Sequence, residues 1–174
     1  SAIISLADKP GSVLDFARTT GATDFTRQMA AEAFTSVARQ DVDNARLMIP
    51  TLAQAQQLND AQIQALRDTV AWRLMGHDAT PEQARWRDDA IMRTGSLSLL
   101  ERRVRMELAS GDRRGLNTWL SRLPMDAKEK DEWRYWQADL LMDRGREEEA
   151  KTILRGLMQQ RGFYPMVAAQ RLNE

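Results

Sequence analysis

Two stretches decide the fold: SGDRRGLNTWLSRL at residues 110–123 and DRGREEEAKTILRGL at residues 143–157. Aligning Gly111 with Gly145 sets the two stretches 34 residues apart and places apolar positions over one another. A weaker third copy is RQDVDNARLMIPTL at residues 39–52, with Gln40 at the glycine position. The predicted core positions of the three copies are Leu116, Trp119, Leu120 and Leu123; Ala150, Ile153, Leu154 and Leu157; and Ala45, Met48, Ile49 and Leu52.

This period resembles that of tetratricopeptide helical hairpins, which repeat about every 34 residues. The resemblance is partial, since the usual Trp and Gly-Tyr positions of the first helix are poorly kept. Arg134 and Gln137 occupy two of them. The sequence therefore predicts an all-α fold, a right-handed superhelix of stacked antiparallel hairpins. In such arrays each helix is buried against its neighbours, without one central core. We expect residues 1–174 to form a single superhelical segment.

Helix start signals recur along the chain. Thr80 and Gln83 have the spacing of a capping box, with Pro81 suited to the first helical position. The same spacing joins two further pairs, Asn59 with Gln62 and Ser98 with Glu101. In each case the side chains would satisfy backbone N–H groups that the first helical turn leaves unpaired. The sequence therefore predicts helices that begin directly after Asn59, Thr80 and Ser98.

The apolar spacing also indicates helices. Two predicted stripes fit a 3.6-residue period and no strand pattern: Phe25, Met29, Ala33 and Val37, and Ile63, Leu66, Val70 and Leu74. Glycines that follow periodic runs predict helix ends: Gly21, Gly76, Gly95, Gly111, Gly145 and Gly162. Pro50 predicts a kink or an end in its helix, because proline lacks the N–H. We expect about ten helices joined by short turns.

Composition excludes several classes of function. Lys plus Arg and Asp plus Glu both number 25, so the net charge is zero and nothing global favours nucleic acid or an anionic membrane. The chain contains no cysteine, which excludes disulfides, thiolate nucleophiles and cysteine–zinc sites. No apolar run reaches the ~18 residues of a membrane span. The first residues, SAIISLADKPG, indicate a segment of a longer protein, with any targeting signal outside it.

Single residues and short motifs that suggest chemistry also have structural interpretations. Gly156-Leu157-Met158-Gln159 resembles part of a catalytic signature, but Leu157 is a predicted core position. His77, the one histidine, lies in a predicted turn without a second histidine or a cysteine for a zinc site. We therefore expect an exposed turn residue at position 77 and a helical packing role for the four-residue motif.

Carboxylates occur in two runs, Asp88-Asp89 and Glu147-Glu148-Glu149. Glycoside hydrolysis needs two carboxyl groups that face each other across the sugar, one with a raised pKa. Adjacent residues on a solvated helix point apart, and the three glutamates would favour the start of a helix. The structural interpretation is the stronger one.

An arginine-rich stretch precedes several aromatic residues and could hold an anionic polymer, a sugar or a peptide. Acidic residues are interleaved with the arginines, and Trp119 is a predicted core position, so a solvated face beside a core is favoured. The residues concerned are Arg102, Arg103, Arg105, Arg113 and Arg114, followed by Trp119, Trp133, Tyr135 and Trp136.

Six stretches of the chain carry a family resemblance: FARTTGATDFTRQMAAEAF, NARLMIPTLAQAQQLN, WRDDAIMR, GDRRGLNTWLSRLP, KEKDEWRYWQADLL and, near the end, FYPMVAAQR. They resemble the soluble lytic transglycosylases of enterobacteria, a family of periplasmic enzymes that cleave peptidoglycan. The resemblance implies a segment of the superhelical, U-shaped domain of such an enzyme, located in the periplasm. It also implies that a lysozyme-like catalytic domain lies C-terminal to this segment, and that the enzyme forms 1,6-anhydro products from the MurNAc–GlcNAc bond.

The family's catalytic motifs do not map onto this chain. No Glu-Ser pair occurs, and Gln160 follows GLMQ where the family has isoleucine. We therefore assign no catalytic, cofactor-binding or metal-binding residue, and no substrate-binding residue can be named. The expected partners are peptidoglycan strands, reached through the whole enzyme, and the enzyme's own catalytic domain, with no cofactor, no nucleic acid and no membrane span.

The sequence therefore leaves three hypotheses about the function. The first is a non-catalytic scaffold segment of a lytic transglycosylase that acts in cell-wall turnover. The second is a stand-alone tetratricopeptide-like module that binds a peptide in a groove. The third, an autonomous hydrolase, lacks a recognisable nucleophile or acid pair in the sequence.

Overall fold

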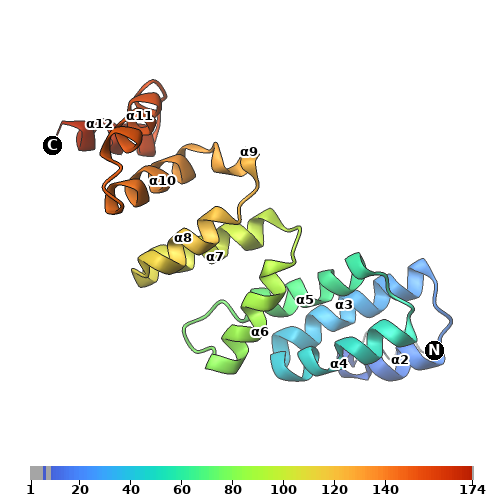
Figure 1. Ribbon diagram of the computed structural model, residues 1–174. Helices are drawn as coiled ribbons and strands as arrows, with labels where there is room; N and C mark the ends of the chain where they lie inside the picture. The colour runs from blue at the N-terminus through green and yellow to red at the C-terminus, as the bar shows by residue number, and fades with distance from the viewer. Residues whose placement is uncertain (1–5, 7–8, 174) are drawn as a thin grey trace. The chain divides into compact units, whose positions relative to one another are not determined.

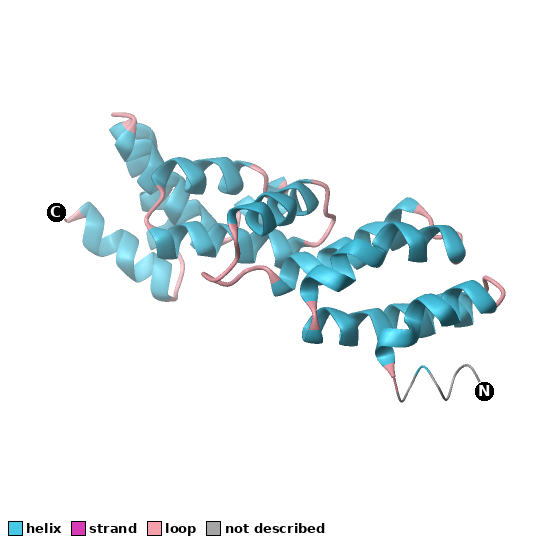
Figure 2. Ribbon diagram, turned by 90° about the horizontal axis from the view of Figure 1, so that it is seen from below, coloured by secondary structure: helices cyan, strands magenta, loops and turns pink. Residues whose placement is uncertain are grey.

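The computed structural model describes residue 6 and residues 9–173. Helices dominate this part of the chain, and none of its residues lies in a β-strand (Figures 1 and 2). The predicted all-α fold is confirmed. In chain order the elements are a 3₁₀ turn η1 (Pro10–Ser12) and helices α2 (Val13–Thr19), α3 (Asp24–Gln40), α4 (Val42–Ala55), α5 (Asp60–Arg73), α6 (Pro81–Met92), α7 (Leu97–Ser110), α8 (Arg113–Ser121), α9 (Met125–Lys128), α10 (Asp131–Asp143), α11 (Glu147–Met158) and α12 (Phe163–Leu172).

Capping side chains fix where several helices begin. Asn59 Oδ1 accepts the Gln62 N–H at 2.8 Å, and the Gln62 side chain accepts the Asn59 N–H at 2.8 Å. Thr80 and Gln83 form the same reciprocal pair at the start of α6. Two of the three predicted capping boxes are thus confirmed, and each satisfies orphan N–H groups of the first turn.

The predicted cap at Ser98 is wrong. Helix α7 begins at Leu97, and Ser96 Oγ accepts the Leu99 N–H at 3.3 Å. Glu101, the expected partner of Ser98, instead accepts the indole N–H of Trp133 at 2.6 Å. A tertiary hydrogen bond to a buried indole therefore takes the carboxylate that the local pattern assigned to the helix start.

Two glycines end their helices in the left-handed conformation. Gly111 has φ of 78° and Gly145 has φ of 72°, values at which a side chain is strained. The Gly145 N–H donates to Met142 O at 3.0 Å, and the next N–H, of Arg146, donates to Leu141 O at 3.0 Å. These bonds satisfy carbonyls that the last turn of α10 leaves unpaired. The glycines aligned in the two clearest repeats thus have the same backbone role.

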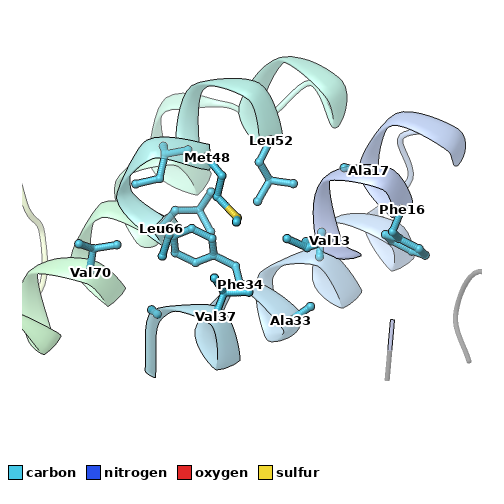
Figure 3. Packing of buried hydrophobic residues seen from close by; sticks show 14 of the residues in the cluster. Val13, Phe16, Ala17, Ala33, Phe34, Val37, Met48, Leu52, Leu66 and Val70 are labelled. Carbon is cyan, nitrogen blue, oxygen red and sulfur yellow. The ribbon is translucent and has the colours of Figure 1, made fainter. Parts of the chain in front are cut away.

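The chain divides into two compact units at Leu99 and Leu100, within α7. In the first unit, α3 and α4 are separated by Asp41 alone and pack together as a hairpin, with α2 and α5 against both. Its buried side chains gather between these helices (Figure 3). The larger members are Leu6, Val13, Phe16, Phe34, Val37, Met48, Ile49, Leu52, Leu66, Val70 and Leu74.

Phe25 does not belong to this core, although the sequence predicts it. It is 56% exposed, whereas Ala33 and Val37 of the same stripe are buried and Met29 is partly buried. Steps of four residues advance about 40° beyond a full helical turn, so a long i, i+4 stripe rotates off the buried face. The second predicted stripe, which mixes steps of three and four, is confirmed by buried Leu66, Val70 and Leu74.

In the second unit, α10 and α11 form a hairpin, joined by residues 144–146, and α12 packs against both. Its core contains Tyr135, Ala138, Ala150, Leu154, Leu157 and Ala168. The predicted repeat positions are confirmed as buried or packed against a core in all three copies. Ile153 is the one of them that is partly exposed. The sense in which the hairpins wind stays a prediction.

Helix α4 runs through Pro50 from Val42 to Ala55, so of the predicted kink or end, the end does not occur there and the kink stays a prediction. The flanking buried residues Ile49 and Leu52 hold this turn against the core, and Pro50 itself faces solvent. Tertiary packing therefore outweighs the lost N–H.

Of the helices in the described part of the chain, none is both long and apolar enough to cross a membrane.

Candidate functional site

The arginine-rich stretch lies on α7 and the start of α8, and the second unit brings its side chains to those of α10. Arg105 donates to the Glu132 carboxylate through Nε at 3.0 Å and Nη2 at 2.9 Å. Its guanidinium carbon lies 5.0 Å from the ring centroid of Trp133, the geometry of a cation–π contact. The hydrogen bond to Glu132 raises the pKa of Arg105. This aromatic face is thus covered by the protein's own cation.

Glu101 is a recessed acid of the second unit, with its side chain about 10% exposed. It accepts the Trp133 indole N–H at 2.6 Å and a Lys130 Nζ hydrogen at 3.0 Å. Burial acts to raise the pKa of Glu101, but the hydrogen bonds from Trp133 and Lys130 and the nearby positive charges outweigh it, so the pKa is lowered. A general acid in glycoside cleavage needs the opposite shift. Glu101 is therefore an ionised structural anchor between α7 and α10.

The predicted solvated face is confirmed for the four arginines that are exposed, Arg102, Arg105, Arg113 and Arg114, and it is wrong for Arg103. Arg103 is 6% exposed, its guanidinium contacts the Glu107 carboxylate one turn on, and it lies 4.8 Å from the Trp119 ring centroid. Gly115 makes room for this pair, because a Cβ there would lie 2.6 Å from Glu107 Oε2. The arginine, its carboxylate and the indole form a buried stack between α7 and α8, which the apolar period alone does not reveal.

Two further arginines converge on Asp139 of α10. Arg113 of α8 pairs with Asp139 and with Asp143, the latter at 2.8 Å. Arg171 of α12 pairs with the other Asp139 oxygen and also donates to Tyr135 Oη at 3.2 Å. Burial acts to lower the pKa of both arginines, but their hydrogen bonds outweigh it and raise the pKa. Asp139 thus joins α8, α10 and α12.

The four-residue motif at 156–159 packs as a helix end. Leu157 is fully buried, Met158 is 45% exposed and Gln159 caps α11. A Cβ at Gly156 would lie 2.7 Å from an Arg134 guanidinium nitrogen, so the glycine admits this side chain. The packing interpretation of the motif is confirmed for Leu157 and Gly156.

The remaining candidates lie apart from one another. His77 is exposed in the turn before α6, as predicted. Asp88 binds Arg87 at 2.9 Å, whereas its neighbour Asp89 contacts Arg93, so the two carboxylates serve different partners. Glutamates 147–149 open α11 and are exposed. In the described residues, no three His, Asp or Glu side chains are grouped to hold a metal ion.

Sequence reasoning missed two hollows. One, of about 390 Å³, lies in the first unit among α3, α4 and α5, with Arg27, Leu52 and Leu66 in its wall. The other, of about 220 Å³, lies in the second unit and contains Lys128 and Arg144. The sequence feature that could have indicated the second hollow is the position of Lys128 and Arg144 at helix ends. Cations at helix ends are equally explained by a favourable interaction with the helix dipole.

The fold and these internally paired clusters define a helical-repeat protein whose polar side chains fasten one helix to the next. No protein-family model matches the chain. Individual proteins do: over all 174 residues the chain is 80% identical to the soluble lytic murein transglycosylase of Escherichia coli K12. It is 76% identical over the same length to the soluble lytic murein transglycosylase of Salmonella typhimurium LT2. The chain spans 27% of the length of each relative.

A solved structure matches as well. It is that of a 70-kDa soluble lytic transglycosylase in complex with bulgecin A, 80% identical to this chain. The TM-score is 0.96, and the match covers 98% of this chain and 28% of that one. The predicted resemblance to soluble lytic murein transglycosylases is confirmed along the whole chain.

Proposed function

We propose that this chain is a non-catalytic scaffold segment of a soluble lytic murein transglycosylase. The whole enzyme would cleave the MurNAc–GlcNAc β-1,4 bond of peptidoglycan in the periplasm, with formation of 1,6-anhydromuropeptides during cell-wall turnover. Residues 1–174 would form one part of its U-shaped superhelical domain and support a lysozyme-like catalytic domain elsewhere in the enzyme. The observation that carries this proposal is 80% identity over the full chain to an enzyme of that name.

The chemistry of the described clusters supports the scaffold role. Glu101 is ionised and hydrogen-bonded to Trp133 and Lys130, so it is unsuited to protonate a glycosidic oxygen. Asp139 and Glu132 are likewise bound by arginines. These carboxylates hold helices together and leave the bond-breaking acid to another part of the enzyme.

Incubation of the purified chain with murein sacculi tests the proposal. We expect no soluble anhydro-muropeptides, whereas the full-length Escherichia coli relative should release them under the same conditions. Release of these products by the chain alone, at a rate that survives further purification, would overturn the scaffold role.

A stand-alone tetratricopeptide-like interaction module is the alternative. The two are distinguished by the parent gene: a scaffold segment requires a coding region for the Glu-Ser and Gly-Leu-Met-Gln-Ile motifs in the same reading frame. A parent gene without such a region would favour the interaction module.

A further inference from the structure

The hollow of the second unit is bounded by four helices. Leu120 of α8, Leu140 and Leu141 of α10 and Ile153 of α11 supply its apolar wall. Its volume is about 220 Å³. A water molecule takes up about 30 Å³ in the liquid, so this volume has room for a small organic group rather than a single ion.

The charged groups in this hollow are all positive. Lys128, the last residue of α9, and Arg144, which follows α10, both line it, and no carboxylate does. Neither cation has an ion-pair partner in the described part of the chain. By contrast, five other cations of this unit have carboxylate partners: Arg103, Arg105, Arg113, Lys130 and Arg171. Two cations are thus left facing an apolar wall where an anion would complement them.

A neutral partner holds the Arg144 guanidinium, and another holds the main chain of Lys128. Arg144 Nη2 donates to Asn117 Oδ1 at 2.6 Å, which fixes the guanidinium and leaves its other N–H groups available. The Gln137 side-chain amide donates to Lys128 O at 2.9 Å and ties the end of α9 to α10. Fixed guanidinium groups are the preferred partners of carboxylates, because their donors match the two oxygens.

We propose that this hollow is a binding site for the carboxyl-terminal residue of a short aliphatic peptide. The carboxylate lies between Arg144 and Lys128, and the small side chain packs against Leu120, Leu141 and Ile153. This assignment goes beyond the scaffold role and does not depend on it, since it follows from charge and shape within one unit.

Isothermal titration of the intact chain with N-acetyl-alanyl-alanine, and with its carboxyl-terminal amide, tests the site. We expect the acid to bind at least about tenfold more tightly than the amide, since hydrogen bonds to a charged group are the stronger ones. Arg144→Gln and, separately, Lys128→Gln should each weaken binding of the acid about tenfold. Added salt should weaken binding of the acid too.

Arg155→Gln is the matched control, because Arg155 is exposed on α11 and does not line the hollow; it should bind the acid like the parent chain. Circular dichroism melting checks that each variant is folded. If the Arg144 variant is unfolded, the affinity of the Lys128 variant for the acid decides the test. Equal affinity for acid and amide, or unchanged affinity in both variants, overturns the site. Acetate that binds as tightly as the dipeptide would also overturn it, since the apolar wall would then contribute nothing.

Discussion

Single residues carry much of the local geometry, and Gly145 shows how. Its φ of 72° lies in the left-handed region, and a Cβ built on it would meet nothing within 4 Å. A substitution there therefore tests the backbone alone, without a steric clash. The same holds for Gly111, with φ of 78°.

We predict that Gly145→Ala lowers the free energy of unfolding by about 1 kcal/mol, because L residues are strained in the left-handed region. Urea denaturation measures the change. Gly95→Ala is the control, since Gly95 has open space and no positive φ. An equal loss in both variants would show that alanine is unfavourable for another reason.

Glu101 makes stability depend on pH. Its pKa in the folded chain is lowered from 4.5, so the folded state binds the proton less readily than the unfolded state. The contribution of the carboxylate to stability is therefore complete above pH 4.5 and is lost as the pH falls through the folded pKa.

We predict that Glu101→Gln lowers the melting temperature at neutral pH, and that the difference from the parent chain shrinks as the pH is lowered below 4.5. The amide oxygen can still accept the Trp133 N–H, so the loss reports the charge. Thermal melts over this pH range measure it. The exposed Glu129→Gln is the control and should leave the curves nearly parallel; a constant gap for the Glu101 variant would contradict the assignment.

At the scale of a helix, α4 continues through Pro50. A proline in a helix interior costs about 3 kcal/mol relative to alanine, through the missing N–H and a clash one turn back. The buried neighbours Ile49 and Leu52 hold the turn in place despite this cost.

We predict that Pro50→Ala raises the free energy of unfolding, by about 1 kcal/mol or more, because the helix regains a hydrogen bond. Chemical denaturation measures the gain. Pro81→Ala is the control: Pro81 is at the first helical position of α6, where the N–H has no partner in the helix, so no gain is expected. A gain of the same size in both variants would point to the unfolded chain rather than to α4.

Leu154 tests the hairpin of α10 and α11. It is 1% exposed, and an unpaired charge at such a position is costly. We predict that Leu154→Asp unfolds this hairpin, seen as lost helical circular dichroism. Met158→Asp on the same helix, where the side chain is 45% exposed, should keep the parent spectrum. An unchanged melting temperature for the Leu154 variant would contradict its place in the core.

How far the sequence predicts these elements depends on the range of the interaction. The repeat register identified buried positions such as Leu120 and Leu154, because helical periodicity is local. The i, i+4 stripe failed at Phe25, because it rotates off the buried face, and the capping pattern failed at Ser98, whose expected partner Glu101 binds Trp133 instead. Such tertiary partners leave no local pattern.

The polar clusters escaped prediction for the same reason. Arg103 was expected in solvent, since its neighbours in sequence are charged, but its surroundings are Glu107 and the Trp119 ring. The hollow beside Arg144 depends on residues from four helices. Only the folded chain shows that Lys128 and Arg144 lack a carboxylate partner, whereas cations such as Arg113 have one.

At the scale of the whole molecule, the positive and negative side chains are equal in number, and many of them also pair with each other locally. Lys plus Arg equals Asp plus Glu at 25 each, and arginines such as Arg105 and Arg113 are bound to carboxylates of α10. A nucleic-acid-binding surface would instead leave several cations free to contact phosphates.

We predict that the chain does not bind a fluorescently labelled DNA duplex at physiological salt. Fluorescence polarisation measures this, with a basic DNA-binding protein as the positive control. Binding that weakens steeply with added salt would reveal a basic surface that the pairing does not neutralise.

The bonds that join α7 and α8 to α10, and α10 to α12, span similar lengths of chain. They connect residues 26 to 36 positions apart, a range that includes the 34-residue repeat. A single residue inserted inside one of these helices would rotate every later residue of that helix by about 100° and break several bonds together. Duplication or excision of a complete two-helix module would leave the surviving pairs in step. The protein's length can therefore change readily in evolution or engineering by such modules, and poorly by single residues added inside a helix.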